Sequence, residues 1–449
     1  MRLTLKALSF IIILCSTGMP KNGYSTETAS GPILGLEDFI EIALRNNPAV
    51  AIARSQVLAS EGRKTQAVSG YLPRLTAKGE AGRIHINDLT PVDEAGVMSG
   101  NLSANQLIYD FGNTTGAISA SVYNIEAARA QLNSVGSDLI YQVKAAYYSV
   151  LEKHHLIMVA NEQVKSYQMH YDRAKEYFKA GVKSKIDVTN AQVELTDAKL
   201  QLLQSRFALK SAKVALEKVV GTNPGEGTYL IQEQDLDLKQ FINFLAPMPV
   251  SREELLQTAT LQRPDLQQAQ KAINSAESLL TAAQGGFWPT LGATASYDTY
   301  NTDLPTLQDQ WQIGIALDWE FFSGFRTQGE VAEAKSSLRS YKAQMRDIEL
   351  TVTQEVTNNF LLAEEQRESV FLANEILTLA EENLDLADQR YKTGLGDMIE
   401  FNDAQLRIAK ARSNLVTAYY GYNTALASLE KAIGIYPDMN EPEIKEIQK

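Results

Sequence analysis

One stretch of this sequence occurs twice: LEKVVGTNP at residues 216–224 returns as LEKAIGIYP at 429–437. At the same offset of 213 residues, KAGVKSKIDVTNAQ (179–192) corresponds to KTGLGDMIEFNDAQ (392–405). A long internal repeat constrains the fold strongly, because each copy must build a similar structure. With only two copies, the chain is a duplicated domain half rather than a solenoid.

The repeat sets the domain organisation that we expect. Residues 1–30 form a signal peptide and a linker, and residues 31–221 form the first structural unit, with helices, two strands and a long helical hairpin. A linker at 222–250 follows, level with the middle of the molecule. Residues 251–437 form the second unit, and 438–449 form a C-terminal tail.

The N-terminus, MRLTLKALSFIIILCSTG, has the form of a secretory signal peptide. Arg2 and Lys6 precede the apolar run Ala7–Cys15, which is too short to cross a bilayer. Cys15 is the only cysteine, so we expect no disulfide in the mature chain. Beyond residue 30 no run of about 18 apolar residues occurs, which excludes a transmembrane helix. The net charge of −12 argues against a nucleic-acid partner.

Four proline-free segments predict unusually long helices. They are residues 113–178, 183–220, 327–391 and 396–434. A helix of about 65 residues is roughly 100 Å long, far longer than an ordinary globular helix. Such lengths are typical of coiled coils or of tunnel walls.

The two shorter of these helices carry a heptad seam in which large and small residues alternate. The first seam is Val188, Ala191, Leu195, Ala198, Leu202, Ser205, Leu209, Ala212, Leu216 and Val219. Adding 213 gives Phe401, Ala404, Ile408, Ala411, Leu415, Ala418, Tyr422, Ala425, Leu429 and Ala432. The alternating spacing of three and four indicates a left-handed supercoil. Small residues in every second layer favour close antiparallel packing, so the seam predicts helical hairpins.

Each predicted hairpin turns at a glycine, Gly181 in KAGV and Gly394 in KTGL. Its arms differ in length, but residues 47–71 and 263–287 offer one more helical stretch per unit. We therefore expect one long helix beside two shorter helices stacked end to end, twice per chain.

Two strand-like segments stand between the helices of each unit. In WQIGIALDWEF (311–321) apolar and small or polar residues alternate over eleven positions, and the segments 290–300, 74–82 and 101–111 alternate more weakly. A two-sided soluble sheet would show the same alternation. The length and the terminal aromatic residues favour strands that cross a membrane. Because four strands cannot close a barrel, the membrane interpretation requires two or three chains.

Together these features resemble the TolC-like outer-membrane efflux factors over roughly residues 36–437. The specific markers are YLPRL and FWPTL, the turns at Phe111–Gly112 and Ser323–Gly324, both hairpin tips and the twin LEKxxG ends. The resemblance implies a mainly α fold with a membrane β-barrel. In a homotrimer, duplicated coiled-coil hairpins would form a periplasmic tunnel and four strands per chain would build a 12-stranded barrel in outer-membrane lipid. It also implies a periplasmic adaptor protein and an inner-membrane pump as partners.

The resemblance also implies roles for particular residues. Glu400 and Asp403, six and nine positions after Gly394, correspond to acidic rings at the narrow periplasmic entrance. Tyr391 and Asp187 correspond to residues that hold this entrance shut. Gly181, Val182, Gly394 and Leu395 stand at the tips, where the adaptor docks. The family's best-studied member has an arginine two positions after the second tip glycine, where this chain has Gly396, and Lys183 or Lys185 are candidates to replace it. For Glu400 and Asp403 the simpler alternative is a solvated helix start.

Other function classes fit the sequence less well. The four histidines, His85, His154, His155 and His170, belong to no metal or catalytic motif, so we expect no enzyme activity, no metal and no cofactor. We read His154 and His155 as ordinary surface residues. A soluble periplasmic coiled-coil scaffold would explain the hairpins but not the strand 311–321. Within the channel class, a component of type I protein secretion remains the alternative to efflux of small molecules.

Overall fold

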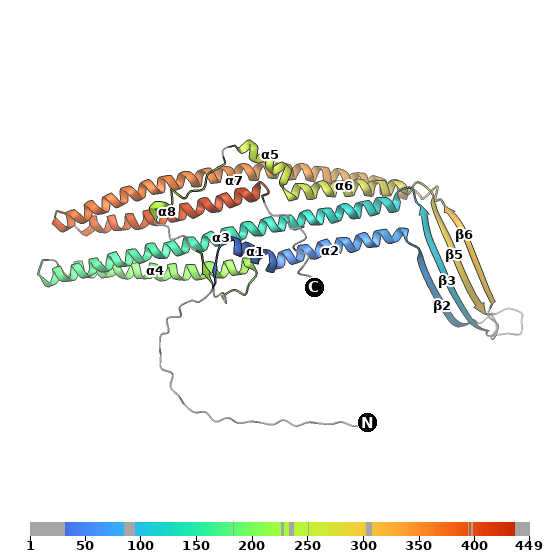
Figure 1. Cartoon of the computed structure of the whole chain (residues 1–449), viewed down its shortest axis with the longest axis horizontal. Coiled ribbons are helices and arrows are strands. Elements are labelled where there is room, and N and C mark those ends of the chain that lie inside the picture. Colours follow the sequence, from blue (N-terminus) through green and yellow to red (C-terminus); the bar gives the residue numbers. More distant parts are fainter. Residues whose placement is uncertain are drawn as a thin grey trace, which may run out of the picture.

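The computed structural model describes residues 32–84, 95–182, 184–225, 229–232, 238–249, 251–301, 308–393, 395–396 and 398–435. The expected signal peptide with Cys15, His85, Lys183, Gly394 and the C-terminal tail lie outside these residues. The described chain is a long layer of helices with a sheet of four strands at one end (Figure 1). No described helix is both long and apolar enough to span a membrane.

The long hairpins form as predicted. In the first, α3 (Asn113–Lys179) packs against α4 (Lys185–Val220), and in the second, α7 (Arg326–Thr393) packs against α8 (Met398–Ala432). With 67 residues, α3 is about 100 Å long. Shorter helices precede the strands of each half: α1 (Leu36–Asn46) and α2 (Pro48–Val68), then α5 (Arg252–Gln262) and α6 (Pro264–Gly285).

Four helices lie side by side along the whole layer. Toward the hairpin tips their order is α7, α8, α3, α4, and toward the sheet it is α7, α6, α3, α2 (Figure 1). The shorter helices are thus stacked end to end beside the two long ones, as the sequence predicts. The two edges of the layer come from different halves of the chain. Helix α7 of the second half forms one edge, and α2 with α4 of the first half forms the other.

The predicted seams lie where the hairpin arms meet. Every seam residue of α4 and α8 is buried or half-buried, including Ala198 and Leu195 in α4 and Ala411 and Leu415 in α8. The small residues let the arms approach closely, and the large ones fill the space between layers. Ion pairs repeat as well, because Glu61–Arg129 joins α2 to α3 and Glu277–Lys342 joins α6 to α7 at corresponding positions.

The repeated LEKxxG stretches end the returning helices at the middle of the molecule. Gly221 and Gly434 have left-handed backbones with φ of 83° and 81°. A side chain on Gly221 would come within 2.8 Å of the Asn46 carbonyl oxygen, so glycine permits both the turn and the contact. At the same level Asn47 Nδ2 donates to the Val219 carbonyl at 2.7 Å.

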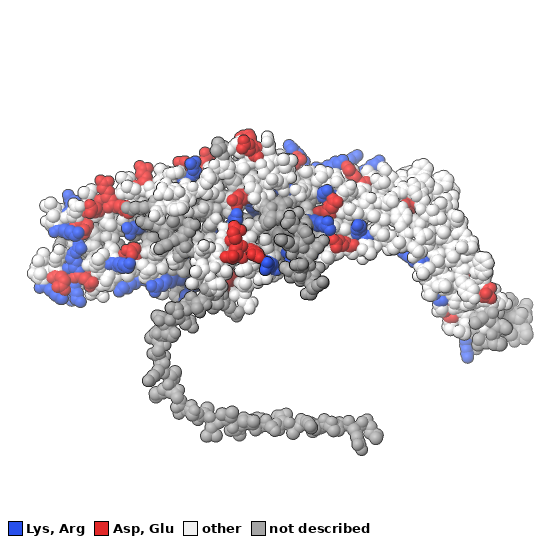
Figure 2. Space-filling model, viewed as in Figure 1, with Lys and Arg blue, Asp and Glu red and all other residues white. Residues whose placement is uncertain are grey.

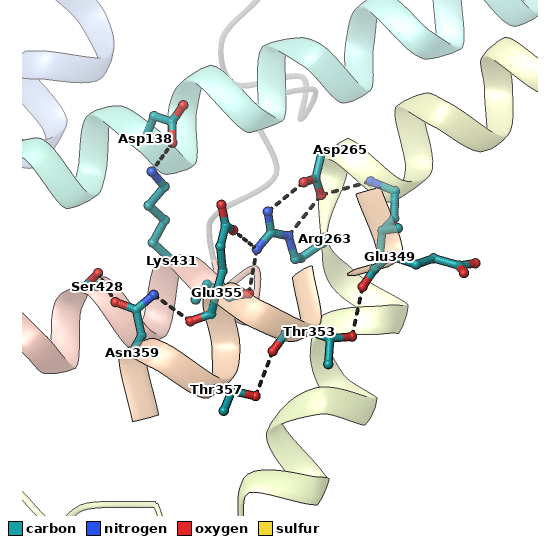
Figure 3. A network of polar contacts seen from close by, with 12 residues as sticks. Asp138, Arg263, Asp265, Glu349, Thr353, Glu355, Thr357, Asn359, Ser428 and Lys431 are labelled. Atoms are coloured by element: carbon teal, nitrogen blue, oxygen red, sulfur yellow. Dashed lines mark hydrogen bonds and ion pairs between the residues drawn. The ribbon is translucent and has the colours of Figure 1, made fainter. Parts of the chain in front are cut away.

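In the second half Arg263 takes the place of Asn47. Its Nη1 donates to the Ala432 carbonyl at 3.1 Å, and its guanidinium also binds Glu355 at 2.6 Å and Asp265 at 2.6 Å (Figure 3). Nearby, Lys431 of α8 pairs with Asp138 of α3 at 2.7 Å. The middle of the molecule is therefore the place where returning helix, short helix and long helix of both halves are joined.

The sheet has the strand order β2 (Arg74–Ile84), β3 (Ala95–Tyr109), β5 (Thr290–Asn301), β6 (Gln308–Asp318), all antiparallel. The apolar side chains of β6 that were predicted to share one face, Trp311, Ile313, Ile315 and Leu317, are all strongly exposed in the single chain. Two short strands, β1 (Ile33–Leu34) and β4 (Leu230–Ile231), form a separate parallel pair. Near the middle, the 3-10 helix Leu238–Gln240 belongs to the connection between the halves.

Candidate channel entrance at the hairpin tips

The tip of the first hairpin closes by backbone hydrogen bonds. Gly181, with φ of 74°, ends α3, and the Val182 amide donates to the Tyr177 carbonyl at 2.9 Å. Asp187 lies in the first turn of α4, where its Oδ2 accepts from the backbone amide of Ser184 at 2.9 Å and from the Ser184 hydroxyl at 2.8 Å. The Asp187 carboxylate therefore caps its own helix.

The tip of the second hairpin is organised around Arg390. Its carbonyl accepts from the amides of Leu395 and Gly396, both at 2.9 Å. Its Nε lies 3.0 Å from Glu400 Oε1, which makes an ion pair between the end of α7 and the start of α8. Asp403 is exposed one turn further along α8. The two predicted entrance acids thus lie on the first turns of one helix, and one of them has an arginine partner.

Tyr391 lies behind this tip in a small apolar cluster. Its partners there are Ala387, Phe401 and Ala404. Burial raises the pKa of the Tyr391 hydroxyl, and the nearby Tyr177 and Asp187 raise it further. The structure thereby brings Tyr391 and Asp187 near each other across the two hairpins, whereas Glu400 and Asp403 lie at the surface of α8.

Sequence reasoning missed His170, which lies between the hairpins at this level. Its ring centroid is 3.9 Å from that of Phe401 and 6.4 Å from that of Tyr391. The pKa of His170 is lowered to about 4, mainly by burial and also by the nearby Arg173, while Asp388 partly offsets the shift. Because Nδ1 of His170 is buried and has no hydrogen-bond partner among the described residues, the neutral ring is the form that fits.

The outermost residues of both tips are apolar and exposed. Val182 is 68% exposed and Leu395 is 76% exposed, and the pair Ile186 and Ile399 repeats this one turn into each returning helix. Charged side chains gather around this end and the middle of the molecule, whereas on the visible face of the sheet they are few and lie toward the end away from the helices (Figure 2). Exposed apolar side chains amid charges are typical of a surface that binds another protein.

With this geometry in view, comparison with known families is decisive. The profile of the family described as outer membrane efflux protein matches residues 39–222 and 255–435, one match for each half of the chain. The chain belongs to this family.

Individual members of the outer membrane efflux protein family are distant in sequence but similar along nearly the whole chain. The probable efflux pump outer membrane protein TtgC of Pseudomonas putida is 22% identical over 409 residues, covering 89% of this chain and 82% of TtgC. The cation efflux system protein CusC of Escherichia coli is 21% identical and covers 89% of this chain and 86% of CusC.

Solved structures show the same fold. A CusC crystal structure superposes with a TM-score of 0.79 at 19% identity, covering 89% of this chain and 92% of that one. The Campylobacter jejuni CmeC outer membrane channel gives a TM-score of 0.77 at 18% identity, covering 92% of this chain and 88% of that one. The predicted architecture of long helical hairpins and four antiparallel strands per chain is confirmed.

Membership of the outer membrane efflux protein family also decides between the function classes. The protein is an outer-membrane channel component of an efflux system with a periplasmic helical part, and it is not an enzyme. This excludes the soluble scaffold that the hairpins alone left open. It also accounts for strands whose apolar faces are exposed in a single chain.

One expectation about the histidines was wrong. His155, interpreted from the sequence as a surface residue, is only 4% exposed. Its Nδ1 lies 3.1 Å from the Tyr420 hydroxyl of α8 and 3.1 Å from the Leu151 carbonyl of its own helix. It packs there because α8 covers this face of α3, which single-sequence periodicity does not reveal. Among the described residues, no group of His, Cys, Asp and Glu is arranged to hold a metal ion.

Proposed function

We propose that three copies of the chain assemble into one closed channel that carries small molecules from the periplasm, or from an inner-membrane pump, to the exterior. In this proposal the halves 31–221 and 251–437 occupy alternate positions around the channel. A periplasmic adaptor joins the channel to the pump. The observation that carries the proposal is a helix face that is covered in one half of the chain and uncovered in the other.

This face is best seen by comparing α4 with α8. Leu203, Phe207 and Val214 of α4 are exposed, whereas the corresponding Val416, Tyr420 and Ala427 of α8 are buried, and α3 packs beside them. Phe207 is 61% exposed and Tyr420 is 7% exposed. Apolar residues at the same positions predict that a helix covers α4 in the same manner.

The helix that would cover α4 is α7 of a neighbouring copy. Tyr148 and Val159 of α3 pack against the core that α8 helps to form, and Leu361 and Leu372 stand at the corresponding positions of α7. Both leucines are exposed, and α7 lies at the edge of the layer opposite α4 (Figure 1). Such a head-to-tail contact between copies generates a ring when the rotation closes.

The sheet supports the same assembly. Strands β2 and β6 are its edges, and each leaves one row of backbone groups without a strand partner among the described residues. Open edges are not tolerated in lipid, and four strands cannot close on themselves. Pairing β2 of one copy with β6 of the next would satisfy both edges, and three copies would give a barrel of twelve strands.

At the other end, we propose that Asp187, Tyr391, Glu400 and Asp403 line or hold the periplasmic entrance. Three-fold symmetry would place the two acids of α8 in rings that favour cations over anions. The tip residues Gly181, Val182, Gly394 and Leu395 would meet the adaptor. The exposure of Val182 and Leu395 supports this role, because apolar tips need a partner.

Relatives support a small cargo rather than a protein. TtgC is named an efflux pump protein and CusC a cation efflux protein. No feature of the described residues favours protein secretion.

Native mass measurement in detergent tests the assembly, and we expect a trimer; a stable dimer would contradict it.

Leu395→Asp should abolish efflux-dependent resistance while trimer levels stay normal, because the side chain is exposed. Unchanged resistance would mean that the adaptor docks elsewhere. Gly181→Pro should act in the same way at the first tip.

A further inference from the structure

We infer that Arg390 determines the charge of the entrance by compensating Glu400, so that Asp403 is the acid whose charge acts on passing ions. This inference rests on the proposed function, because it concerns the same entrance. It concerns selectivity rather than folding, since an ion pair at this exposure contributes little to stability.

Arg390 is fixed along the tip by contacts of its main chain and its side chain. It is anchored by its carbonyl, which accepts two amides of the turn, and its Nη2 also reaches the Leu395 carbonyl at 3.4 Å. The side chain therefore lies along the tip rather than away from it. From there its Nε contacts Glu400 Oε1 at 3.0 Å. With its main chain fixed in the turn and its guanidinium in contact with the Leu395 carbonyl and Glu400, Arg390 stays near this carboxylate.

Gly396 lies close to both members of the ion pair. A side chain on Gly396 would place its Cβ 3.0 Å from Arg390 Cβ and 3.1 Å from Glu400 Oε2. Both contacts are tighter than most Cβ contacts in proteins, so a larger residue here would require the pair to shift. The glycine thus leaves room for a cation to reach Glu400 from α7.

Asp403 differs from Glu400 in its surroundings. No ion pair connects Asp403 to any residue that the structure describes, and its side chain is exposed. Opposite charges 3 Å apart act at a distance as a weak dipole, whereas an uncompensated carboxylate acts as a full charge. In a trimer the entrance would therefore present one strongly acidic ring, formed by Asp403, and one ring of compensated pairs.

Single-channel recordings of the purified full-length protein in planar bilayers test this at low salt. Arg390→Gln should raise the preference for potassium over chloride roughly sevenfold, because a unit charge about 7 Å away in water changes the occupancy of each ion by a factor of about 2.7, in opposite directions. Glu400→Gln should lower it by a similar factor, because Arg390 is then uncompensated. The double variant Arg390→Gln with Glu400→Gln should return to the wild-type preference, because the two changes cancel.

A matched control is Lys392→Gln. It removes a positive charge two residues away, but Lys392 pairs with Asp388 rather than with Glu400. Its effect on ion preference should be smaller than that of Arg390→Gln, and an equal effect would overturn the assignment to Arg390. Gly396→Ala should shift the preference slightly in the direction of Arg390→Gln, since the added methyl group displaces the pair.

The outcomes separate the inference from the function on which it rests. If the double variant behaves like Glu400→Gln alone, Arg390 does not compensate the acid and the inference fails, although the channel stands. If the wild-type protein forms no ion-conducting channel, the proposed function fails and the inference with it.

Discussion

Helices α4 and α8 descend from one repeated sequence, yet the structure buries them differently. Each packs its heptad seam against the long arm of its own hairpin, but α8 also covers α3, whereas the outer face of α4 is uncovered. The residues on this outer face of α4 and at the corresponding positions of α8 are apolar or aromatic in both helices. In the proposed assembly, the exposed face of α4 is therefore the place where α7 of a neighbouring copy packs.

Two glycines show the same difference near the sheet. A side chain on Gly116 of α3 would come within 2.7 Å of the Ser278 carbonyl oxygen and 2.9 Å of the Ala282 Cβ, both in α6. The corresponding Gly329 of α7 has nothing within 4 Å, and neither has Gly62, which corresponds to Ser278. Glycine inside an exposed helix costs about 1 kcal/mol relative to alanine, so Gly329 is best explained by a close approach of a neighbouring copy.

The largest effect is expected from enlarging these glycines. Gly116→Leu should prevent folding of the chain, because the leucine would collide with the backbone of α6 at a cost of several kcal/mol. Gly329→Leu should leave each chain folded and abolish the trimer, because only a neighbour would meet the leucine. Circular dichroism reports folding and native electrophoresis reports assembly. If Gly329→Leu assembles normally, α7 does not approach another copy here.

A smaller effect is expected from shortening an aromatic residue in each helix. Phe207→Ser should lower the temperature at which trimers dissociate, because burying a phenylalanine stabilises a contact by about 1.5–3 kcal/mol. Its counterpart Tyr420→Ser should instead destabilise the single chain and leave His155 without its hydroxyl partner. Heated samples on gels measure the first effect, and denaturant unfolding measures the second. Equal behaviour of the two variants would contradict the comparison.

The smallest effect concerns pH. His170 has a pKa of about 4 in the packed state and about 6.5 when solvated, so the packed state binds fewer protons in that window. The contact between the hairpins should therefore lose stability as pH falls from about 6.5 to 4, by about 2 kcal/mol at pH 5, and change little further below pH 4. The groups facing His170 are Arg173 on α3, Asp388 and Tyr391 on α7, and Phe401 on α8.

This pH effect should occur at the contact between the two hairpins of one chain and not at the proposed contact between copies. At the latter, α7 takes the place of α3, and its residue that corresponds to His170 is Asn383. Acid should raise the conductance of the wild-type channel between pH 7 and pH 5. His170→Asn should remove that response. An acid response that persists in His170→Asn would assign it to other groups.

Much of this fold could be predicted from the sequence because its signals are local and periodic. The seams, the glycine turn at Gly181, the stacked short helices and the alternating face of β6 all follow from spacing alone. Contacts between distant segments could not be predicted. The burial of His155 and His170 and the bond from Arg263 to Ala432 depend on which helix lies alongside, which a heptad pattern does not specify. At the candidate entrance, the nearness of Tyr391 and Asp187 fits the resemblance, but the Arg390–Glu400 pair required the structure.

In the proposed trimer, α7 of one copy meets α2 and α4 of the next as α3 meets α6 and α8 within the chain. Gln66 corresponds to Ala282, so a disulfide between Gln66→Cys and Gly329→Cys tests this contact between copies. The expected mature chain has no cysteine of its own, and the pair Gly116→Cys with Ala282→Cys provides the control within one chain. We predict covalent trimers from Gln66→Cys with Gly329→Cys on non-reducing gels, and only monomers from either single variant. Monomers alone from the double variant, while the control pair forms its internal disulfide, would contradict the account.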